Sequence, residues 1–416
     1  MTAIRPFKGL TPKASLAKRV AAPLWDVLSS EQARVKAAGN ELSFLHVIRP
    51  ENEFPSGVCP TPNELLRKSA DNLQILLRRG VYEESKTPGF CLYRLTMGNH
   101  SQIGVVVSVA ATEYYDGKIK KHEHTRRDRE ERLAEHINVV GAHTSPVFLT
   151  YRHCKEIDDL VAQLVQSDPM LDFVADDAVG HTLWCIDREP DIAKLVELFD
   201  TIPCCYIADG HHRTAAAALV SRLRQQQNLQ HSGEEPYNFF LAVLFPDDQM
   251  QILDYNRCVR TLNGHTPQSL LQALDRDFEV TELGTGCARE AKPKRPHEYG
   301  MLLGRVWYRI RLRPDQCGTN SVRASLDVMV LQDRILAPLL GIDDPRTSED
   351  IEFVSGLQGL EGLECRCNSE CAIAFALYPP SIDHLISIAD MGEVMPPKST
   401  SFEPKLQAGL ILSLLD

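Results

Sequence analysis

Three kinds of ionisable side chain stand next to one another between Ala208 and Thr214, in the order Asp-Gly-His-His-Arg. The preceding residues 204–208 form a short apolar run of strand length, and the residues from Thr214 onward have the composition of a helix. We therefore expect a strand, a tight turn at Gly210 and a helix that begins directly after it. The free N–H groups at the start of a helix favour an anion such as phosphate.

The polar side chains of this corner suit phosphate chemistry. Arg213 can hold a phosphate with two parallel hydrogen bonds, and His211 and His212 can donate hydrogen bonds or carry protons. Asp209 would repel phosphate unless it binds a metal ion or takes up a proton. The combination indicates phosphoryl transfer rather than simple anion binding. The alternative is a surface turn whose polar residues only cap the helix.

A second polar segment, residues 120–126, contains two lysines, two histidines, a glutamate and an arginine. Phosphoryl transfer to a hydroxyl needs cations to hold the charged oxygens and a carboxylate to accept the proton. Lys120 and Lys121 are candidate phosphate ligands, Glu123 is the candidate base, and Arg126 is a candidate substrate ligand. We expect the charged residues 127–135 to form a solvated helix with i,i+4 ion pairs.

These motifs carry a resemblance to a known family. The Asp-Gly-His-His-Arg corner, together with residues 4–10, 120–123 and 395–400, is similar to the domain-of-unknown-function family 1015, and the likeness spans nearly the whole chain. That family resembles serine kinases of the ParB/sulfiredoxin-like superfamily. The resemblance implies a ParB/sulfiredoxin-like core around the corner, with additional family-specific elements. It also implies a kinase that converts free L-serine to O-phosphoserine, with pyrophosphate as donor and Mg²⁺ as cofactor.

The resemblance also suggests roles for single residues. Glu123, Asp209 and His211 would be catalytic, and Asp209 would hold Mg²⁺ or assist proton transfer. The phosphates would be bound by Gly210, His212, Arg213, Lys120 and Lys121. Tyr255-Asn256-Arg257 also matches the family pattern, so Asn256 and Arg257 would join Arg126 in binding the substrate, for example through an amino acid's carboxylate. A purely structural role for Asn256 and Arg257 is the alternative.

Two other functions stay open at this point. One is a ParB-like nucleotide-binding switch or adaptor without kinase activity. The other is an ADP- or ATP-dependent kinase of a different small hydroxy compound. The sequence contains no G-x-x-x-x-G-K-[ST] phosphate loop, which favours a small donor such as pyrophosphate.

Composition narrows the class of protein. The net charge of −11 argues against a nucleic-acid partner, because binding to the phosphate backbone needs a basic surface. No apolar run reaches the roughly 18 residues of a membrane span. Twelve cysteines are too sparse for a disulfide scaffold, and we expect reduced thiols and a cytoplasmic protein with small-molecule partners. The oligomeric state is not determined by these features.

Strands and helices are expected to alternate irregularly, which is typical of an α+β or mixed α/β fold. An amphipathic helix is expected from Asn63 to Arg79, and a strand from Ser43 to Ile48. We expect residues 1–283 to form a catalytic region with both motifs and residues 284–298 to form a surface loop or linker. Residues 299–416 should form a C-terminal α+β region packed on the first.

Overall fold

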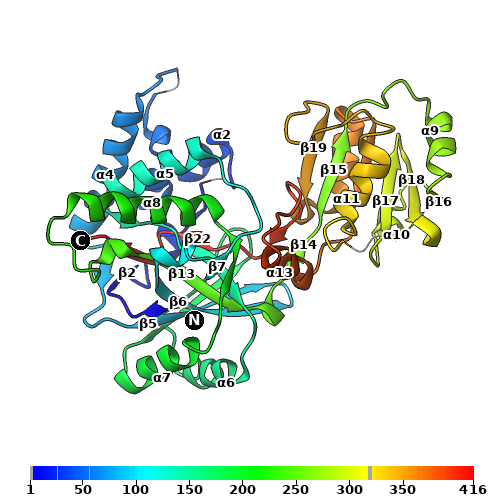
Figure 1. The fold of residues 1–416 in the computed structure, drawn as a ribbon. Coiled ribbons are helices and arrows are strands. Elements are labelled where there is room, and N and C mark those ends of the chain that lie inside the picture. The colour runs from blue at the N-terminus through cyan, green and yellow to red at the C-terminus, as the bar shows by residue number, and fades with distance from the viewer. Residues whose placement is uncertain (1–2, 26, 56, 317–320) are drawn as a thin grey trace. The chain divides into compact units, whose positions relative to one another are not determined.

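The structure is a computed structural model, and it describes residues 3–25, 27–55, 57–316 and 321–416. The chain forms two compact units (Figure 1). Unit 1 contains Met1–Met250 and Pro404–Asp416, and unit 2 contains Gln251–Glu403. Both units combine helices with sheets, so the expected mixed α/β class is confirmed.

A nine-stranded sheet forms the centre of unit 1. Its path runs β10-β11-β5-β6-β13-β9-β12-β7, and β1 pairs with β6. The strands are β1 (Ile4–Arg5), β5 (Phe90–Met97), β6 (His100–Ala110), β7 (Ile119–Lys120), β9 (Val147–Tyr151), β10 (Leu171–Val174), β11 (Gly180–Ile186), β12 (Cys205–Asp209) and β13 (Phe239–Pro246).

Strand direction decides which loops of unit 1 lie together. Strands β9 and β13 are parallel, whereas β12 is antiparallel to β9. The carboxyl ends of β9 and β13 therefore meet at one edge of the sheet. The carboxyl end of β12, which carries Asp209, lies at the opposite edge, where Asp209 is in register with Phe148 near the start of β9.

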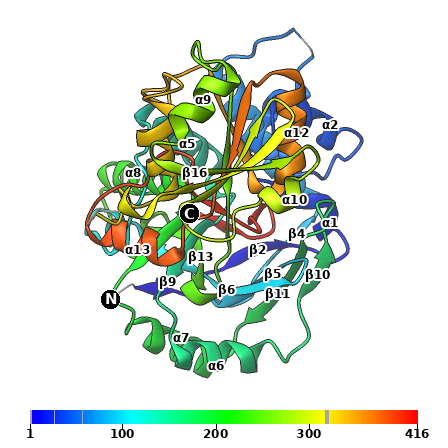
Figure 2. The same cartoon turned by 90° about the vertical axis from the view of Figure 1, so that its right-hand side faces the viewer.

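Helices cover both faces of this sheet (Figure 2). Helices α6 (Lys155–Leu164) and α7 (Glu189–Phe199) lie on one face, and α5 (Arg127–Val140) and α8 (His211–Gln227) lie on the other. Apolar side chains of α6 and α7 join those of the strands in one buried core. The layered packing fixes the strand ends, where polar side chains collect.

Most of the remaining helices of unit 1 are N-terminal. They are α1 (Ala17–Val20), α2 (Ser30–Ala37), α3 (Leu45–Ile48) and α4 (Pro62–Arg78). Helix α4 confirms the helix expected from residues 63 to 79. Thr61 begins it, because its hydroxyl accepts from the backbone N–H of Glu64 while the Glu64 carboxylate accepts from the backbone N–H of Thr61.

The strand expected from Ser43 to Ile48 is wrong, because this segment contains helix α3. A short apolar run suits a buried helix as well as a buried strand, so periodicity could not separate the two. Local contacts favour the helix: the Ser43 hydroxyl accepts from the backbone N–H of Leu45 at 3.3 Å. Leu45 and Val47 are both buried in the helical arrangement.

Smaller sheets connect the two ends of the described chain within unit 1. One has the order β4-β2-β23-β8, formed by β2 (Gly9–Pro12), β4 (Tyr82–Glu84), β8 (Ala142–His143) and β23 (Leu412–Leu414). In the other, β3 (Ala22–Pro23) pairs with β22 (Gln407–Ala408). Residues after 404 are thus integral strands of unit 1.

Unit 2 is built on a six-stranded sheet of order β16-β18-β17-β20-β15-β19. These strands are β15 (Tyr255–Val259), β16 (Phe278–Gly284), β17 (Glu298–Leu303), β18 (Val306–Leu312), β19 (Ile351–Ser355) and β20 (Ile373–Ala376). Two short strands, β14 (Ile252–Leu253) and β21 (Ser401–Phe402), pair with each other. The helices of unit 2 are α9 (Pro267–Leu274), α10 (Ala288–Ala291), α11 (Asp327–Leu331), α12 (Gly359–Ser369) and α13 (Ile382–Asp390).

The two compact units do not begin and end where the sequence led us to place the boundaries between regions. The chain enters unit 2 after Met250, and residues 284–298 lie inside unit 2, where they include helix α10. That residues 1–283 form the catalytic region stays a prediction.

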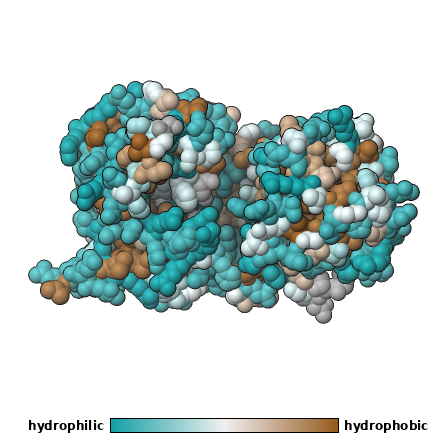
Figure 3. Space-filling view, turned by 90° about the horizontal axis from the view of Figure 1, so that it is seen from above, coloured by the Kyte–Doolittle hydropathy of each residue, from teal (hydrophilic) through white to brown (hydrophobic). Residues whose placement is uncertain are grey.

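The visible surface is mostly hydrophilic, and apolar residues appear on it as separate patches (Figure 3). Within the described part of the chain, no helix combines the length and apolar character that crossing a bilayer requires.

Candidate active site

The expected strand–turn–helix corner is present in unit 1. Strand β12 ends at Asp209 and helix α8 begins at His211. Gly210 joins them with a φ of +99°, in the left-handed region that favours glycine. A Cβ atom at this position would lie 3.0 Å from the guanidinium of Arg213. The tight approach of Arg213 therefore depends on Gly210.

Asp209 is held between two cations. Nη2 of Arg213 donates to its Oδ2 at 2.6 Å, and Nζ of Lys405 lies 3.5 Å from its Oδ1. Nη1 of Arg213 also donates to the carbonyl oxygen of Pro146. Burial alone would raise the pKa of Asp209, but the charges of Lys405 and Arg213 lower it to about 2. Asp209 is thus an ionised carboxylate that fixes the direction of Arg213.

The fold brings the second polar segment, residues 120–126, to this corner. Strand β7 runs parallel to β12, which places Lys120 in register with Tyr206. The backbone N–H of His122 donates to Nε2 of His211 at 3.4 Å, and the two rings meet edge to face at 4.4 Å. Of the eleven site residues named from the sequence, the nine from the two motifs therefore belong to one neighbourhood of unit 1.

The hydrogen bonds at His211 determine which ring nitrogen carries the proton. Nε2 accepts from the backbone, so Nδ1 carries the hydrogen in the neutral ring. That Nδ1 lies 3.8 Å from a carboxylate oxygen of Glu123. Burial, reinforced by the neighbouring His122, lowers the pKa of His211 well below its usual value. A neutral His211 can thus point an N–H towards Glu123, whose own side chain is 55% exposed.

A cavity of about 500 Å³ extends from this corner beneath helix α5. Four arginines line it: Arg126, Arg129, Arg132 and Arg213. Apolar and aromatic groups line another part of it: Trp25, Ile48, Leu133, Ile137, Phe240 and Leu241. The polar residues Asp128, His136, His143, Thr144 and Ser145 line it as well. The cavity therefore offers positive charge together with an apolar surface, which suits an anionic ligand with a less polar part.

Sequence reasoning missed the two middle arginines of this cavity. The expectation of a solvated helix holds for Arg127, which pairs with Glu131 at 2.8 Å and is 90% exposed. Arg129 and Arg132, however, line the cavity. The pattern of Arg129, Arg132, Leu133 and residues 136–137 follows one helical face and is the signal that could have identified them.

Residues 4–329 match the family model described as "Protein of unknown function (DUF1015)". The chain belongs to the DUF1015 family. None of the curated proteins compared with this DUF1015 chain matches it significantly.

Solved structures similar to the DUF1015 chain are distant. A free serine kinase mutant in complex with AMP is 14% identical, with a TM-score of 0.33, and the match covers 72% of this chain and 86% of that one. A conserved hypothetical protein from Pyrococcus furiosus is 16% identical, with a TM-score of 0.30 and coverage of 72% and 90%. SbnI with a C-terminal truncation, from Staphylococcus aureus, is 12% identical, with a TM-score of 0.34 and coverage of 72% and 82%.

The two other predicted substrate ligands of the DUF1015 chain, Asn256 and Arg257, belong to strand β15 of unit 2. Arg257 is buried and donates to the carbonyl oxygens of Tyr255 at 2.7 Å and Lys398 at 3.0 Å. Asn256 donates to Asp254 at 2.6 Å. Both side chains thus stabilise unit 2, and their role in binding substrate stays a prediction.

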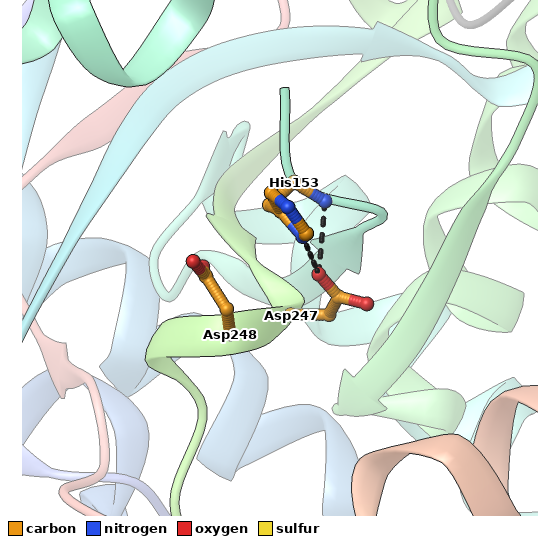
Figure 4. A group of neighbouring side chains, drawn as sticks. All are labelled: His153, Asp247 and Asp248. Atoms are coloured by element: carbon orange, nitrogen blue, oxygen red, sulfur yellow. Dashed lines mark hydrogen bonds and ion pairs between the residues drawn. The ribbon is translucent and has the colours of Figure 1, made fainter. Parts of the chain in front are cut away.

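The predicted magnesium site on Asp209 has a poor fit in this DUF1015 chain. Each carboxylate oxygen of Asp209 faces a cationic side chain, so a metal ion would have to displace Arg213 or Lys405. Among the described residues, one group has metal-ligand geometry, and it consists of His153, Asp247 and Asp248 (Figure 4). The cysteines of the described residues are free thiols, as expected.

Proposed function

We propose that this DUF1015 protein is a phosphotransferase that phosphorylates the hydroxyl group of free L-serine. The observation that supports this proposal most strongly is that residues 120–126 contact the Asp-Gly-His-His-Arg corner, and that an arginine-lined cavity lies beside both. Cations outnumber carboxylates there, which suits a polyanionic phosphate donor. A carboxylate that accepts the hydroxyl proton must be accessible to the substrate, and the half-exposed side chain of Glu123 meets this requirement.

The reaction would use Glu123 as the general base. The serine hydroxyl gives its proton to Glu123 while its oxygen attacks the terminal phosphorus of the donor. The bond from that phosphorus to the bridging oxygen breaks, and the leaving phosphate keeps the electron pair. The Nδ1–H of the neutral His211 would face Glu123, with Nδ1 3.8 Å from a carboxylate oxygen. O-phosphoserine and the shortened donor are the products.

The donor's phosphates would be bound by the start of helix α8 and the surrounding cations. The left-handed Gly210 has no capping side chain, so N–H groups of the first helical turn face the site. Arg213, with Lys120 and Lys121, supplies charge. Pyrophosphate meets these requirements with no further contact, and it is our leading donor.

A nucleotide donor is the second candidate, and one observation favours it. The cavity has an apolar wall with Trp25 that pyrophosphate would leave empty, whereas the base and sugar of ADP or ATP would occupy it. Arg129 and Arg132 would then hold the nucleotide's phosphates.

We propose that Mg²⁺ enters the site bound to the phosphates of the donor. Mg²⁺ in phosphoryl-transfer sites is bound by one or two carboxylates together with substrate phosphates. Asp209 would serve better as the residue that aims Arg213 than as a metal ligand, because both of its oxygens face cations.

Phosphorus NMR of the purified protein tests this proposal. Pyrophosphate, ADP and ATP are supplied separately with L-serine and Mg²⁺, and we expect the O-phosphoserine resonance with pyrophosphate or with a nucleotide. L-alanine, which lacks the hydroxyl, is the control acceptor and should give no new phosphoester. Saturable nucleotide binding without phosphoserine from any donor would instead support a ParB-like binding switch.

A further inference from the structure

We propose that His153, Asp247 and Asp248 form a divalent cation site at the edge of the sheet opposite the Asp-Gly-His-His-Arg corner. One ligand atom from each of these residues lies within 4.8 Å of those from the other two. Figure 4 shows the two aspartates on the segment after β13 and the ring of His153 facing them. The site is independent of the proposed kinase activity and would take its metal without a phosphate donor.

The topology of unit 1 explains why these residues meet. His153 follows the carboxyl end of β9, and Asp247 and Asp248 follow the carboxyl end of β13. These strands are parallel neighbours, with Tyr151 in register with Pro246. Loops after the carboxyl ends of adjacent parallel strands are where ligands of α/β proteins commonly bind.

The donor set is a mixed one, with an imidazole and two carboxylates. Nδ1 of His153 lies 3.2 Å from Oδ1 of Asp247. Two ligand atoms bound to the same tetrahedral ion at about 2.0–2.1 Å are roughly 3.4 Å apart, so this spacing is close to that of neighbouring ligands. A cation could enter from solvent, because the His153 side chain is 59% exposed.

The balance of charge supports a cation rather than a simple ion pair. Arg152 donates to Asp247 at 2.9 Å and is the cation paired with the group. Asp248 makes no side-chain hydrogen bond or ion pair within the described residues. Asp248 therefore adds a carboxylate charge that Arg152 does not pair with in the described residues, and a bound cation would balance that charge.

The ligand types predict which metal is preferred. Imidazole is a good ligand for Zn²⁺ and other late transition metals, and carboxylates suit Mn²⁺ and Mg²⁺. A combination of His153 with aspartates therefore favours Zn²⁺ or Mn²⁺ over Mg²⁺. The preference separates this site from a magnesium ion that arrives with a phosphate donor.

Isothermal titration calorimetry of the full, tag-free chain with ZnCl₂ and with MnCl₂, without phosphate donor, tests the site. We expect saturable binding of one ion per chain, weaker binding of Mg²⁺, and a rise in melting temperature with the bound ion. His153→Ala and Asp248→Asn should each weaken Zn²⁺ binding by more than about tenfold. Both side chains are exposed, so the variants should fold normally, which circular dichroism checks.

Asp200→Asn is the matched control, since Asp200 is an exposed aspartate of unit 1 at the end of helix α7. Its Zn²⁺ affinity should equal that of the unaltered chain. The proposal is overturned if no saturable binding occurs, if His153→Ala and Asp248→Asn bind as tightly as the unaltered chain, or if Asp200→Asn loses as much affinity as they do.

Discussion

Nη2 of Arg213 lies 2.6 Å from Oδ2 of Asp209, one helical turn away across the left-handed Gly210. The pair explains why a carboxylate stands in a corner suited to phosphate. Asp209 holds the guanidinium in the wall of the arginine-lined cavity, and Arg213 also donates to the carbonyl oxygen of Pro146. If the corner binds phosphate as we propose, a residue that repels phosphate positions one that attracts it.

This relationship predicts a pH-dependent stability. The folded pKa of Asp209, about 2, is below the ordinary value of 3.8, so its stabilising effect is complete above about pH 4 and is lost as the pH falls towards 2. A shift of this size corresponds to roughly 2 kcal/mol. Urea unfolding should show Asp209→Asn less stable than the unaltered chain by about that amount at pH 6. The difference should shrink steadily below pH 4, and a constant difference would contradict the assigned ion pairs.

Arg213→Lys should weaken donor use by more than tenfold in kcat/KM. Lysine has no planar, two-pronged group, so it cannot contact Asp209, Pro146 and a phosphate together. Steady-state kinetics with each donor measures the effect. Arg222→Lys, on the outer part of the same helix, is the control and should leave kcat/KM unchanged. Equal kcat/KM values for the two variants would show that Arg213 stabilises the helix and does not contribute to donor use.

Glu123→Gln should lower kcat by roughly 10²–10⁴-fold, because glutamine keeps the size of the side chain but cannot accept the serine proton. The side chain is 55% exposed, so the melting temperature should change little. Calorimetry should find donor binding unchanged or tighter, because a negative charge has been removed. Normal turnover with a lowered melting temperature would assign Glu123 a structural role.

Arg132→Gln should weaken the binding of ADP or ATP several-fold more than that of pyrophosphate, if the cavity beneath α5 holds a nucleotide. The matched control is Arg127→Gln on the same helix, since Arg127 is 90% exposed and pairs with Glu131 rather than lining the cavity. Titration calorimetry compares the two variants. Equal losses for nucleotide and pyrophosphate would exclude a separate subsite for the base and sugar.

The sequence was most informative where local chemistry decides the structure. Asp-Gly-His-His-Arg predicts a strand, a left-handed turn and a helix because only glycine adopts the required φ easily, and β12, Gly210 and α8 confirm this. That residues 120–126 lie next to the corner could be suspected only because the side chains of both segments suit phosphoryl transfer. It depends on β7 pairing with β12 across more than 80 residues, which no local pattern specifies.

Other features depend on long-range packing and could not be read from the sequence. Lys405 reaches Asp209 from a strand-rich segment that follows the whole of unit 2. His153 and Asp247 come together only because β9 and β13 are parallel neighbours. The segment 43–48 shows the same limit on a smaller scale, since its short apolar run is compatible with a buried strand as well as with the buried helix α3.

The return of the chain to unit 1 has a consequence for its synthesis. Strand β23 lies between β2 and β8, and Lys405 completes the cation pair around Asp209, yet both are translated only after all of unit 2. At roughly 5–20 residues per second, a nascent unit 1 waits on the order of ten seconds for its last strand. During that interval the edges of β2 and β8 lack their partner and Asp209 lacks one of its cations. The sheets of unit 1 can therefore be completed only after unit 2 has been translated.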